Sequence, residues 1–270
     1  MSLATVVVNG EEPDLERRFG GVGRLYGAAA LRRFQAARVG VVGIGGVGSW
    51  AAEALARSAI GRIALIDLDM VAESNVNRQI HALDGAFGKA KTDATAERIR
   101  AINPACRIDT IEDFVTPENV ATLIGEDFDY IIDAIDQVRT KAAMIAWCAR
   151  NGRPLITAGG AGGQIDPARI EIADLSRTVQ DPLLAKVRSL LRKEYGFTRD
   201  PKKKFGIPAV FSTEPVRHPE RGDACALPAS PAGLNCAGYG SSVCVTAAFG
   251  FFAASVALRH IAHAGTGPGR

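Results

Sequence analysis

The stretch Val39-Gly40-Val41-Val42-Gly43-Ile44-Gly45-Gly46-Val47-Gly48 decides the fold of this chain. Its apolar beginning, up to Val42, is typical of a buried parallel strand. A G-x-G-x-x-G pattern follows at once, and the alanine-rich segment 51–56 behind it favours a helix. Strand, glycine turn and helix in this order are the fingerprint of a dinucleotide-binding unit. We therefore expect a phosphate-binding turn built from Gly43, Gly45, Gly46 and Gly48.

A second apolar strand over 62–66 ends at Asp67, with Asp69 two residues further on. An acid about 20 residues beyond the glycine turn is the position of a ribose-binding carboxylate. The pattern predicts a nucleotide site near both acids but does not say which nucleotide. The alternative is a glycine-rich turn that binds no ligand.

Composition sets the broad class. The chain has 270 residues, 47% hydrophobic and 23% charged, with a net charge of +3. This length suits one α/β domain, and the charge does not demand a polyanionic partner, although local patches could bind one. Five cysteines form no C-x-x-C pair, which argues against a structural zinc site. No secretory signal opens the sequence, so we expect reduced thiols in the cytoplasm, and a disordered lead over 1–12.

Alternating strand and helix patterns up to residue 163 predict a Rossmann-like, doubly wound α/β fold with a mainly parallel sheet. We expect one domain over 1–270, with an antiparallel C-terminal extension that includes a strand at 169–173. We expect a mobile excursion at 175–225, with a helix over 181–195 and a polar segment rich in Pro, Lys and Arg over 199–224. An apolar helix follows at 238–263. Its part 241–258 suits a buried core or dimer helix, and the alternative is contact with a membrane.

Polar groups follow several strand ends, which lie together at one edge of such a sheet. The expected set includes Asp67, Arg78, Lys91 and Asp136. The two cations would meet phosphates, and Asp136 would bind Mg²⁺ as a hard carboxylate ligand. Each of the two cations also has a simpler explanation. Arg78 could be an ordinary surface charge, and Lys91 could lie on a solvated helix face. Asp133 could be only a hydrogen-bond partner at a strand end, so it ranks below Asp136.

Five segments in order resemble the adenylating superfamily that activates ubiquitin-like proteins and sulfur carriers: Gly43-x-Gly45-Gly46-x-Gly48, Asp67-x-Asp69, Asn75-x-x-Arg78-Gln79, Gly88-x-x-Lys91 and Asp133-x-x-Asp136. The resemblance implies conversion of ATP to AMP and pyrophosphate through an acyl-adenylate. It also implies a homodimer. In that superfamily the residue matching Asp67 binds ribose and the one matching Asp136 binds Mg²⁺. The phosphates are bound by residues matching Asn75, Arg78, Gln79 and Lys91.

Further segments resemble one branch, the tRNA threonylcarbamoyladenosine dehydratases: 18–27, 77–83, 113–117, 159–167 and 211–214. This resemblance implies ATP-dependent cyclising dehydration of N6-threonylcarbamoyladenosine at tRNA position 37. The ring would close by intramolecular attack of urea oxygen or nitrogen. Carrier-protein activators usually carry two C-x-x-C pairs, which this chain lacks.

Several points stay open. Cys225 or Cys236 could instead form a thioester. Either Arg18 or Arg24 could reach the ATP of a second subunit. A tRNA surface could be formed by basic residues from Arg192 to Arg221, including Lys202-Lys203-Lys204, and a sulfur-mobilising protein could be a partner. The alternative functions are adenylation of a sulfur-carrier protein, NAD-dependent dehydrogenation and non-catalytic nucleotide binding.

Overall fold

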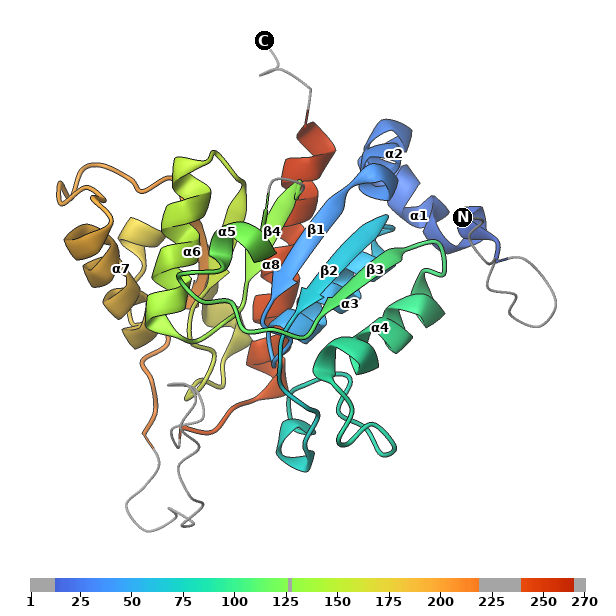
Figure 1. Ribbon diagram of the computed structural model, residues 1–270, viewed down its shortest axis with the longest axis horizontal. Helices are drawn as coiled ribbons and strands as arrows, with labels where there is room; N and C mark the ends of the chain where they lie inside the picture. Colours follow the sequence, from blue (N-terminus) through green and yellow to red (C-terminus); the bar gives the residue numbers. More distant parts are fainter. Residues whose placement is uncertain (1–12, 126–127, 219–238, 265–270) are drawn as a thin grey trace.

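The computed structural model describes residues 13–125, 128–218 and 239–264, and Figure 1 shows their arrangement. Seven strands form one sheet in the order β3-β2-β1-β4-β5-β7-β6. The strands are β1 (Arg38–Val42), β2 (Arg62–Ile66), β3 (Arg107–Ile111), β4 (Tyr130–Asp133), β5 (Leu155–Ala158), β6 (Ile170–Asp174) and β7 (Pro208–Ser212). Neighbouring strands are parallel except β6, which is antiparallel to β7. The expected doubly wound, mainly parallel sheet with an antiparallel extension is confirmed.

The position of β7 corrects one expectation. Part of the segment predicted to be a mobile excursion enters the sheet between β5 and β6, and four of its five residues are buried. The helix α7 (Pro182–Glu194) precedes it and buries four apolar side chains. Polar flanking sequence hid the strand because Pro208–Ser212 is short and gains its stability from pairing on both sides. Residues 219–225 of the predicted excursion, like the predicted lead over 1–12, lie outside the described residues.

Two hydrophobic clusters lie on opposite faces of the sheet. The first is formed with α2 (Ala28–Ala36), α3 (Gly48–Arg57), α4 (Lys91–Ile102) and α8 (Val243–His263). The second is formed with α5 (Val120–Leu123), α6 (Val138–Arg150) and α7. Helix α1 (Leu15–Tyr26) lies beside α2, and short 3-10 turns occur at Glu73–Asn75, Pro167–Arg169 and Leu175–Arg177.

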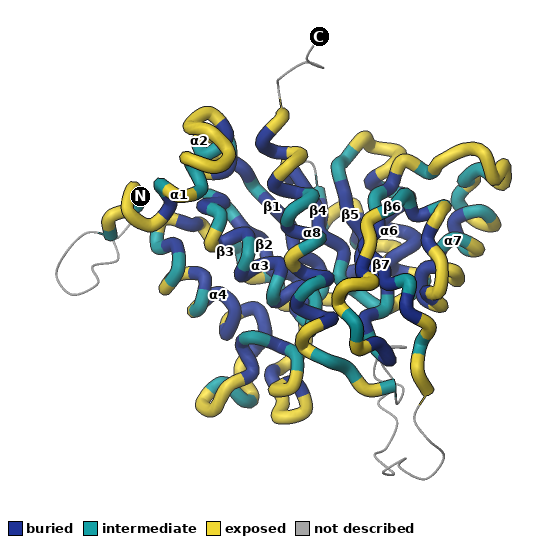
Figure 2. The backbone as a smooth tube through the Cα atoms, turned by 180° about the vertical axis from the view of Figure 1, so that it is seen from behind, coloured by how far each residue is buried: buried dark blue, intermediate teal, exposed yellow. Residues whose placement is uncertain are grey.

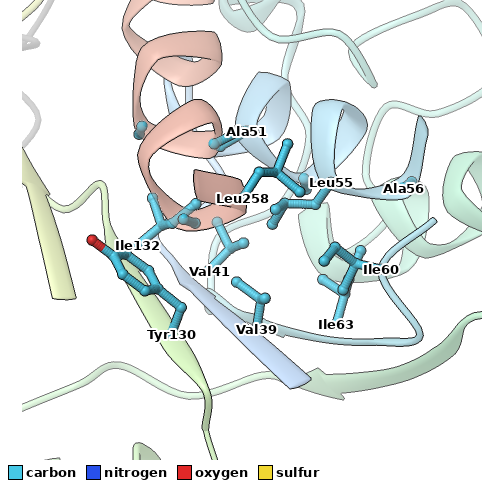
Figure 3. Close-up of a cluster of buried hydrophobic side chains, with 14 of the residues drawn as sticks. Val39, Val41, Ala51, Leu55, Ala56, Ile60, Ile63, Tyr130, Ile132 and Leu258 are labelled. Carbon is cyan, nitrogen blue, oxygen red and sulfur yellow. The ribbon is translucent and has the colours of Figure 1, made fainter. Parts of the chain in front are cut away.

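Beyond Arg38, β1 shows why its sequence is apolar. Val39 and Val41 point into the first cluster, whereas Val42 belongs to the second. A strand covered by helices on both faces has no solvent side, which favours apolar residues along it. Figure 3 shows Val39 and Val41 beneath Leu55 of α3 and Leu258 of α8. This burial fixes the end of β1, from which the glycine turn starts.

Helix α8 is long and apolar enough to cross a membrane, yet eleven of its 21 residues are buried inside the protein. Figure 2 shows it running across the sheet beside α3, largely in the colours of buried and intermediate residues. At Gly250 an added Cβ would lie 2.5 Å from the carbonyl oxygen of Val47. Only glycine allows so close a contact, and the contact fixes α8 against the start of α3. Packing within the protein accounts for the apolar composition of α8, as the core-helix prediction expected.

Candidate active site

A pocket lies at the carboxyl ends of β1, β2 and β4, where the strand order reverses. The pocket lining includes most residues that the sequence analysis selected for the nucleotide site: Gly43, Gly45, Gly46, Asp67, Asp69, Arg78, Gln79, Lys91 and Asp136. Further lining comes from Asp113, Phe114, Val115, Ile135, Gln137, Ala161, Gly162, Ser241 and Thr246. The sheet therefore brings together most of the side chains that the sequence selected. Gly48 and Asn75 lie outside this lining.

The glycine turn has the geometry that its residue types predict. Gly43 has φ of +86°, a conformation that residues with a Cβ rarely adopt. A Cβ on Gly48 would lie 1.8 Å from the Gly43 carbonyl oxygen, so Gly48 serves the close contact between α3 and the turn. Gly45 has no atom within 4 Å of its Cβ position and lines the pocket. Its backbone is thus open to a ligand at the start of α3, where helix N–H groups favour an anion.

Asp67 connects the ends of two strands. Its Oδ2 accepts a hydrogen bond from the Ile44 N–H at 2.6 Å, and its Oδ1 accepts one from the Asp69 N–H at 2.8 Å. Burial raises the pKa of the Asp67 carboxyl, while the charge of Lys91 and the two N–H donors oppose this. The carboxylate orients the glycine turn and lies in the pocket, as the ribose-binding prediction requires.

Lys91 is the first residue of α4, and its side chain is only 8% exposed. Its Nζ lies 2.7 Å from Asp69 Oδ2, and its N–H donates to the Asp69 carbonyl oxygen at 3.0 Å. The alternative that Lys91 lies on a solvated helix face is therefore wrong. The α4 start and the Asp69 segment hold the ammonium group in the pocket.

Arg78 is half-buried, and its Nη1 donates to the Ser74 carbonyl oxygen at 2.8 Å and to Asn77 Oδ1 at 2.9 Å. The Trp50 indole N–H donates to the Arg78 carbonyl oxygen at 2.9 Å. These contacts fix the residue next to the glycine turn, since a Cβ on Gly46 would lie 3.1 Å from Arg78 Cγ. Arg78 is thus a positioned pocket residue rather than a loose surface charge.

Gln79 and Asn75 are both buried but differ in role. Gln79 lines the pocket, and its Oε1 has no hydrogen-bond partner in the described part of the chain. A buried polar atom without a partner is costly, which points to a ligand that completes it. Asn75 instead accepts from the Ala72 N–H at 3.1 Å and stabilises the turn that carries Arg78. Its predicted contact with phosphate remains a prediction.

Asp133 and Asp136, three residues apart, have separate environments. Asp133 is fully buried: its Oδ1 lies 2.8 Å from Lys141 Nζ, and Thr157 Oγ1 donates to its Oδ2 at 2.7 Å. Burial raises the pKa of the Asp133 carboxyl, and Lys141 opposes that shift. Asp133 does not line the pocket, whereas Asp136 does. The ranking of Asp136 above Asp133 follows the geometry.

The ion pair of Lys141 with Asp133 was not predicted from the sequence. Besides contacting the carboxylate, Lys141 Nζ donates to Thr157 Oγ1 at 3.0 Å, and the Ile135 N–H donates to Asp133 Oδ1 at 3.3 Å. The available signal was a lysine directly before the apolar run 142–149 of α6. The network lies directly beneath the segment 134–137 that carries Asp136.

The start of α8 also lines the pocket, which the sequence analysis missed. Ser241 and Thr246 belong to the segment that was considered only as a core or membrane helix. Asn77 Nδ2 donates to the Ser241 carbonyl oxygen and to its Oγ, both at 3.2 Å. Figure 1 shows the lower end of α8 at the same end of the sheet as the segment that follows β2. Two serines ahead of an apolar run signalled a helix start there but not its location.

The two candidate arginines of the N-terminal arm differ. Arg18 Nη1 donates to the carbonyl oxygens of Ala101 and Ile102 at 3.1 and 2.9 Å. It therefore stabilises the C-terminus of α4 within its own chain. Arg24 is exposed near the end of α1. Arg18 is exposed as well, so which of the two reaches the ATP of a second subunit stays a prediction.

The thioester and Mg²⁺ expectations both stay predictions. Cys225 and Cys236, the candidates for a thioester, lie outside the described residues. Burial raises the pKa of Cys106 and Cys148 to about 12, which makes both poor nucleophiles. Among residues 13–125, 128–218 and 239–264, no three His, Cys, Asp or Glu side chains form a metal cluster. Any metal here would need ligands from a bound substrate as well as from the protein.

Known proteins agree with this architecture. The family model described as the ThiF family matches residues 21–203. A tRNA threonylcarbamoyladenosine dehydratase from Haemophilus influenzae is 54% identical over 241 residues, covering 89% of this chain and 91% of that relative. The enzyme of that name from Bacillus subtilis is 43% identical, covering 70% of this chain and 71% of that relative.

Solved structures of the Escherichia coli tRNA N6-threonylcarbamoyladenosine dehydratase, TcdA, are similar along most of the chain. The complex with ATP has a TM-score of 0.83 and 52% identity, covering 91% of this chain and 94% of that one. The complex with AMP has a TM-score of 0.83 and 50% identity, covering 96% and 98%. The glycine turn, the sheet order and these similarities together place the chain in the ThiF family, among its tRNA threonylcarbamoyladenosine dehydratases.

Proposed function

We propose that this protein catalyses the ATP-dependent cyclising dehydration of N6-threonylcarbamoyladenosine at position 37 of tRNA. The observation that carries the proposal is the pocket itself. It combines an open glycine turn, the Asp67 carboxylate and two fixed cations in a chain that is 54% identical to a dehydratase of this name. A hydride-transfer site does not need two cations beside the phosphate turn, so ATP suits this pocket better than NAD.

The first step is activation of an acid. The threonine carboxylate attacks the α-phosphorus of ATP, the bond to pyrophosphate breaks, and an acyl-adenylate forms. Negative charge develops on the phosphate oxygens during this step. Arg78 and Lys91 are fixed by hydrogen bonds and an ion pair, so they can stabilise that charge without costly reorganisation.

The second step closes the ring. The neighbouring carbamoyl group attacks the activated carbonyl carbon, loses a proton and expels AMP. The net change in the nucleoside is the loss of one water, whose oxygen leaves with AMP. Attack within one molecule benefits from high effective molarity, so this route needs no enzyme nucleophile.

We also propose that Asp136 holds Mg²⁺ together with ATP. The carboxylate lines the pocket, and no hydrogen bond or ion pair involves its side chain within the described residues. One carboxylate with substrate phosphates is a common donor set for Mg²⁺, and it agrees with the absence of a metal cluster among the described side chains. Bound Mg²⁺ would neutralise charge on the phosphate oxygens.

The partners follow from the proposed substrate. Exposed cations near the end of α7 and in the turn behind it could contact tRNA phosphates: Lys193, Arg199, Lys202, Lys203 and Lys204. Figure 1 shows this turn projecting at the edge of the molecule between α7 and β7. Arg217 is also exposed, and Arg221 lies outside the described residues. A tRNA substrate implies a cytoplasmic location.

A homodimer is part of the proposal. Phe251 of α8 is 47% exposed and stacks edge-on against Trp50 of α3, with ring centroids 5.8 Å apart. Such an aromatic pair suits a subunit interface better than open solvent. Light scattering should give twice the mass of one chain, and a monomer at micromolar concentration would contradict this.

A sulfur-mobilising protein partner remains a prediction without further support.

The decisive experiment measures AMP release and tRNA nucleosides together. Purified enzyme is incubated with labelled ATP and tRNA that carries threonylcarbamoyladenosine, and the nucleosides are analysed by mass spectrometry. We expect tRNA-dependent AMP and a nucleoside lighter by one water. AMP release that ignores tRNA but rises with a diglycine-tailed carrier protein would instead support adenylation of a carrier.

An Asp136→Asn variant tests the metal role within the same assay. We expect turnover to fall by about 100-fold or more, because the variant loses a charged metal ligand at the phosphates. Asp84→Asn is the matched control, since Asp84 is exposed and lies outside this pocket. Unchanged turnover in Asp136→Asn would remove Asp136 from the proposed role.

A further inference from the structure

The start of α8 and the glycine turn lie against one another. A Cβ built on Gly46 would lie 3.1 Å from Arg78 Cγ and 3.4 Å from Thr246 Cβ, so these two residues are both immediate neighbours of Gly46. The second glycine of the motif, Gly45, directly precedes Gly46 and is where a phosphate approaches the backbone. Thr246 therefore lies at the phosphate end of the pocket, away from the ribose end at Asp67.

Thr246 has an incomplete environment. The residue is 4% exposed and lines the pocket, and its Oγ1 has no hydrogen-bond partner in the described residues. Gln79, also in the pocket lining, is 5% exposed and has an Oε1 in the same condition. Most buried polar atoms are hydrogen-bonded, so two unpartnered oxygen atoms that line the same pocket point to a polar ligand in it.

The chain holds this end of α8 firmly. Ser242 Oγ accepts from the Cys244 N–H at 3.3 Å, and the Gly163 N–H donates to the Gly240 carbonyl oxygen at 3.0 Å. One turn beyond Thr246, Gly250 fits against Val47 so closely that no side chain could be added. A group bound at the start of α8 therefore has a fixed position relative to the glycine turn.

Two helices thus begin at the phosphate end of the pocket. The N-terminus of α3 follows the glycine turn, and the 21-residue α8 begins beside it. Each helix carries a partial positive charge at its N-terminus, and one suffices for a phosphate. The proposed reaction brings a second anion, a carboxylate, up to a triphosphate that repels it. The attacking carboxylate oxygen and the leaving pyrophosphate oxygen lie on opposite sides of the α-phosphorus, roughly in line. The carboxylate therefore needs a favourable environment of its own, separate from the one that binds pyrophosphate.

We propose that the N-terminal turn of α8 is the acceptor site for the attacking carboxylate, with Thr246 Oγ1 as its hydrogen-bond donor. The inference rests on the proposed function, because it assigns the second substrate of the same pocket. Thr246 orients the carboxylate toward the α-phosphorus, and Arg78, the other neighbour of Gly46, offsets the combined negative charge. The hydroxyl takes no part in proton transfer.

Three variants test the assignment. Thr246→Val removes the hydroxyl at nearly constant volume, and Thr246→Ser keeps it. Thr92→Val is the matched control, because Thr92 on α4 is also fully buried with an unpartnered Oγ1 but does not line the pocket. Each variant is measured for ATP affinity by calorimetry and for kcat/KM with tRNA that carries threonylcarbamoyladenosine. Thermal unfolding checks the fold of each.

A hydrogen bond to a charged group is worth enough to change kcat/KM by about 10- to 100-fold. We expect Thr246→Val to lose that much with the modified tRNA, while its ATP affinity stays within about twofold. Thr246→Ser should recover most of the loss, and Thr92→Val should resemble the wild type. A matching fall in ATP affinity in Thr246→Val would show that the hydroxyl binds the triphosphate and overturn the assignment. Full activity of Thr246→Val, or failure of Thr246→Ser to recover it, would also overturn it. Failure of the proposed function itself would be seen separately, as a wild-type enzyme that releases no AMP with this tRNA.

Discussion

Replacing Lys141 by Met tests the buried ion pair beneath the Asp136 segment. Both partners are fully buried, with Lys141 Nζ 2.8 Å from Asp133 Oδ1. Methionine keeps most of the apolar stem, so little packing is lost and the main effect is an unpaired buried carboxylate. Breaking such a pair from one side costs about 3–5 kcal/mol. Thr157 and the Ile135 N–H continue to donate hydrogen bonds to Asp133 in the variant. We therefore expect a loss of unfolding free energy at the lower end of this range, about 3 kcal/mol.

The assay is equilibrium urea unfolding of wild type, Lys141→Met, Asp133→Asn and the double variant. The double variant leaves no buried charge at this site, so its loss should be smaller than the sum of the single losses by about 1–3 kcal/mol. Lys186→Met makes the same substitution at an exposed position of α7 and should change stability by less than about 0.5 kcal/mol.

The pH dependence gives an independent check. Burial already raises the pKa of Asp133, and loss of Lys141 removes the charge that opposes this shift. In Lys141→Met the folded protein therefore binds a proton at a higher pH than the unfolded chain does. Stability relative to wild type should then recover as pH falls through the raised pKa. A loss below about 1 kcal/mol at neutral pH, or a loss that does not shrink on acidification, would refute the reasoning.

Three further substitutions test the glycine turn and Lys91. Gly48→Ala should destabilise the protein by about 3 kcal/mol, because the new Cβ would lie 1.8 Å from the Gly43 carbonyl oxygen. Gly45→Ala is the control and should unfold at the same urea concentration as the wild type, because no atom lies within 4 Å of its Cβ position. Equal stability of the two variants would contradict this expectation. Lys91→Met should abolish tight ATP binding and raise the pKa of His81 above its value of about 4. Burial is the main cause of that low pKa, and the charges of Lys91 and Arg98 lower it further. NMR titration of His81 measures that shift, and an unchanged pKa would show that the two side chains do not interact.

The order of elements and the nucleotide end of the pocket could be predicted because their signals are local. An apolar run predicts a strand that is covered on both faces. Gly43 and Gly48 are required by their immediate surroundings, Gly43 by its positive φ and Gly48 by its close contact with the Gly43 carbonyl oxygen. The ends of parallel strands must meet at one edge of the sheet. Asp67, Lys91 and Asp136 could therefore be assigned to one site before any coordinates were known.

What the sequence could not determine depends on contacts between distant segments. Pro208–Ser212 is a strand because β5 and β6 provide hydrogen-bonding edges on both of its sides. The local sequence does not predict these two neighbours. The apolar composition of α8 is equally compatible with a core or a membrane, and its packing against α3 accounts for it. The same packing brings Thr246 next to Gly46, 200 residues earlier in the chain. Local sequence specifies which elements form, whereas the long-range burial of their surfaces decides which residues face one another across the pocket.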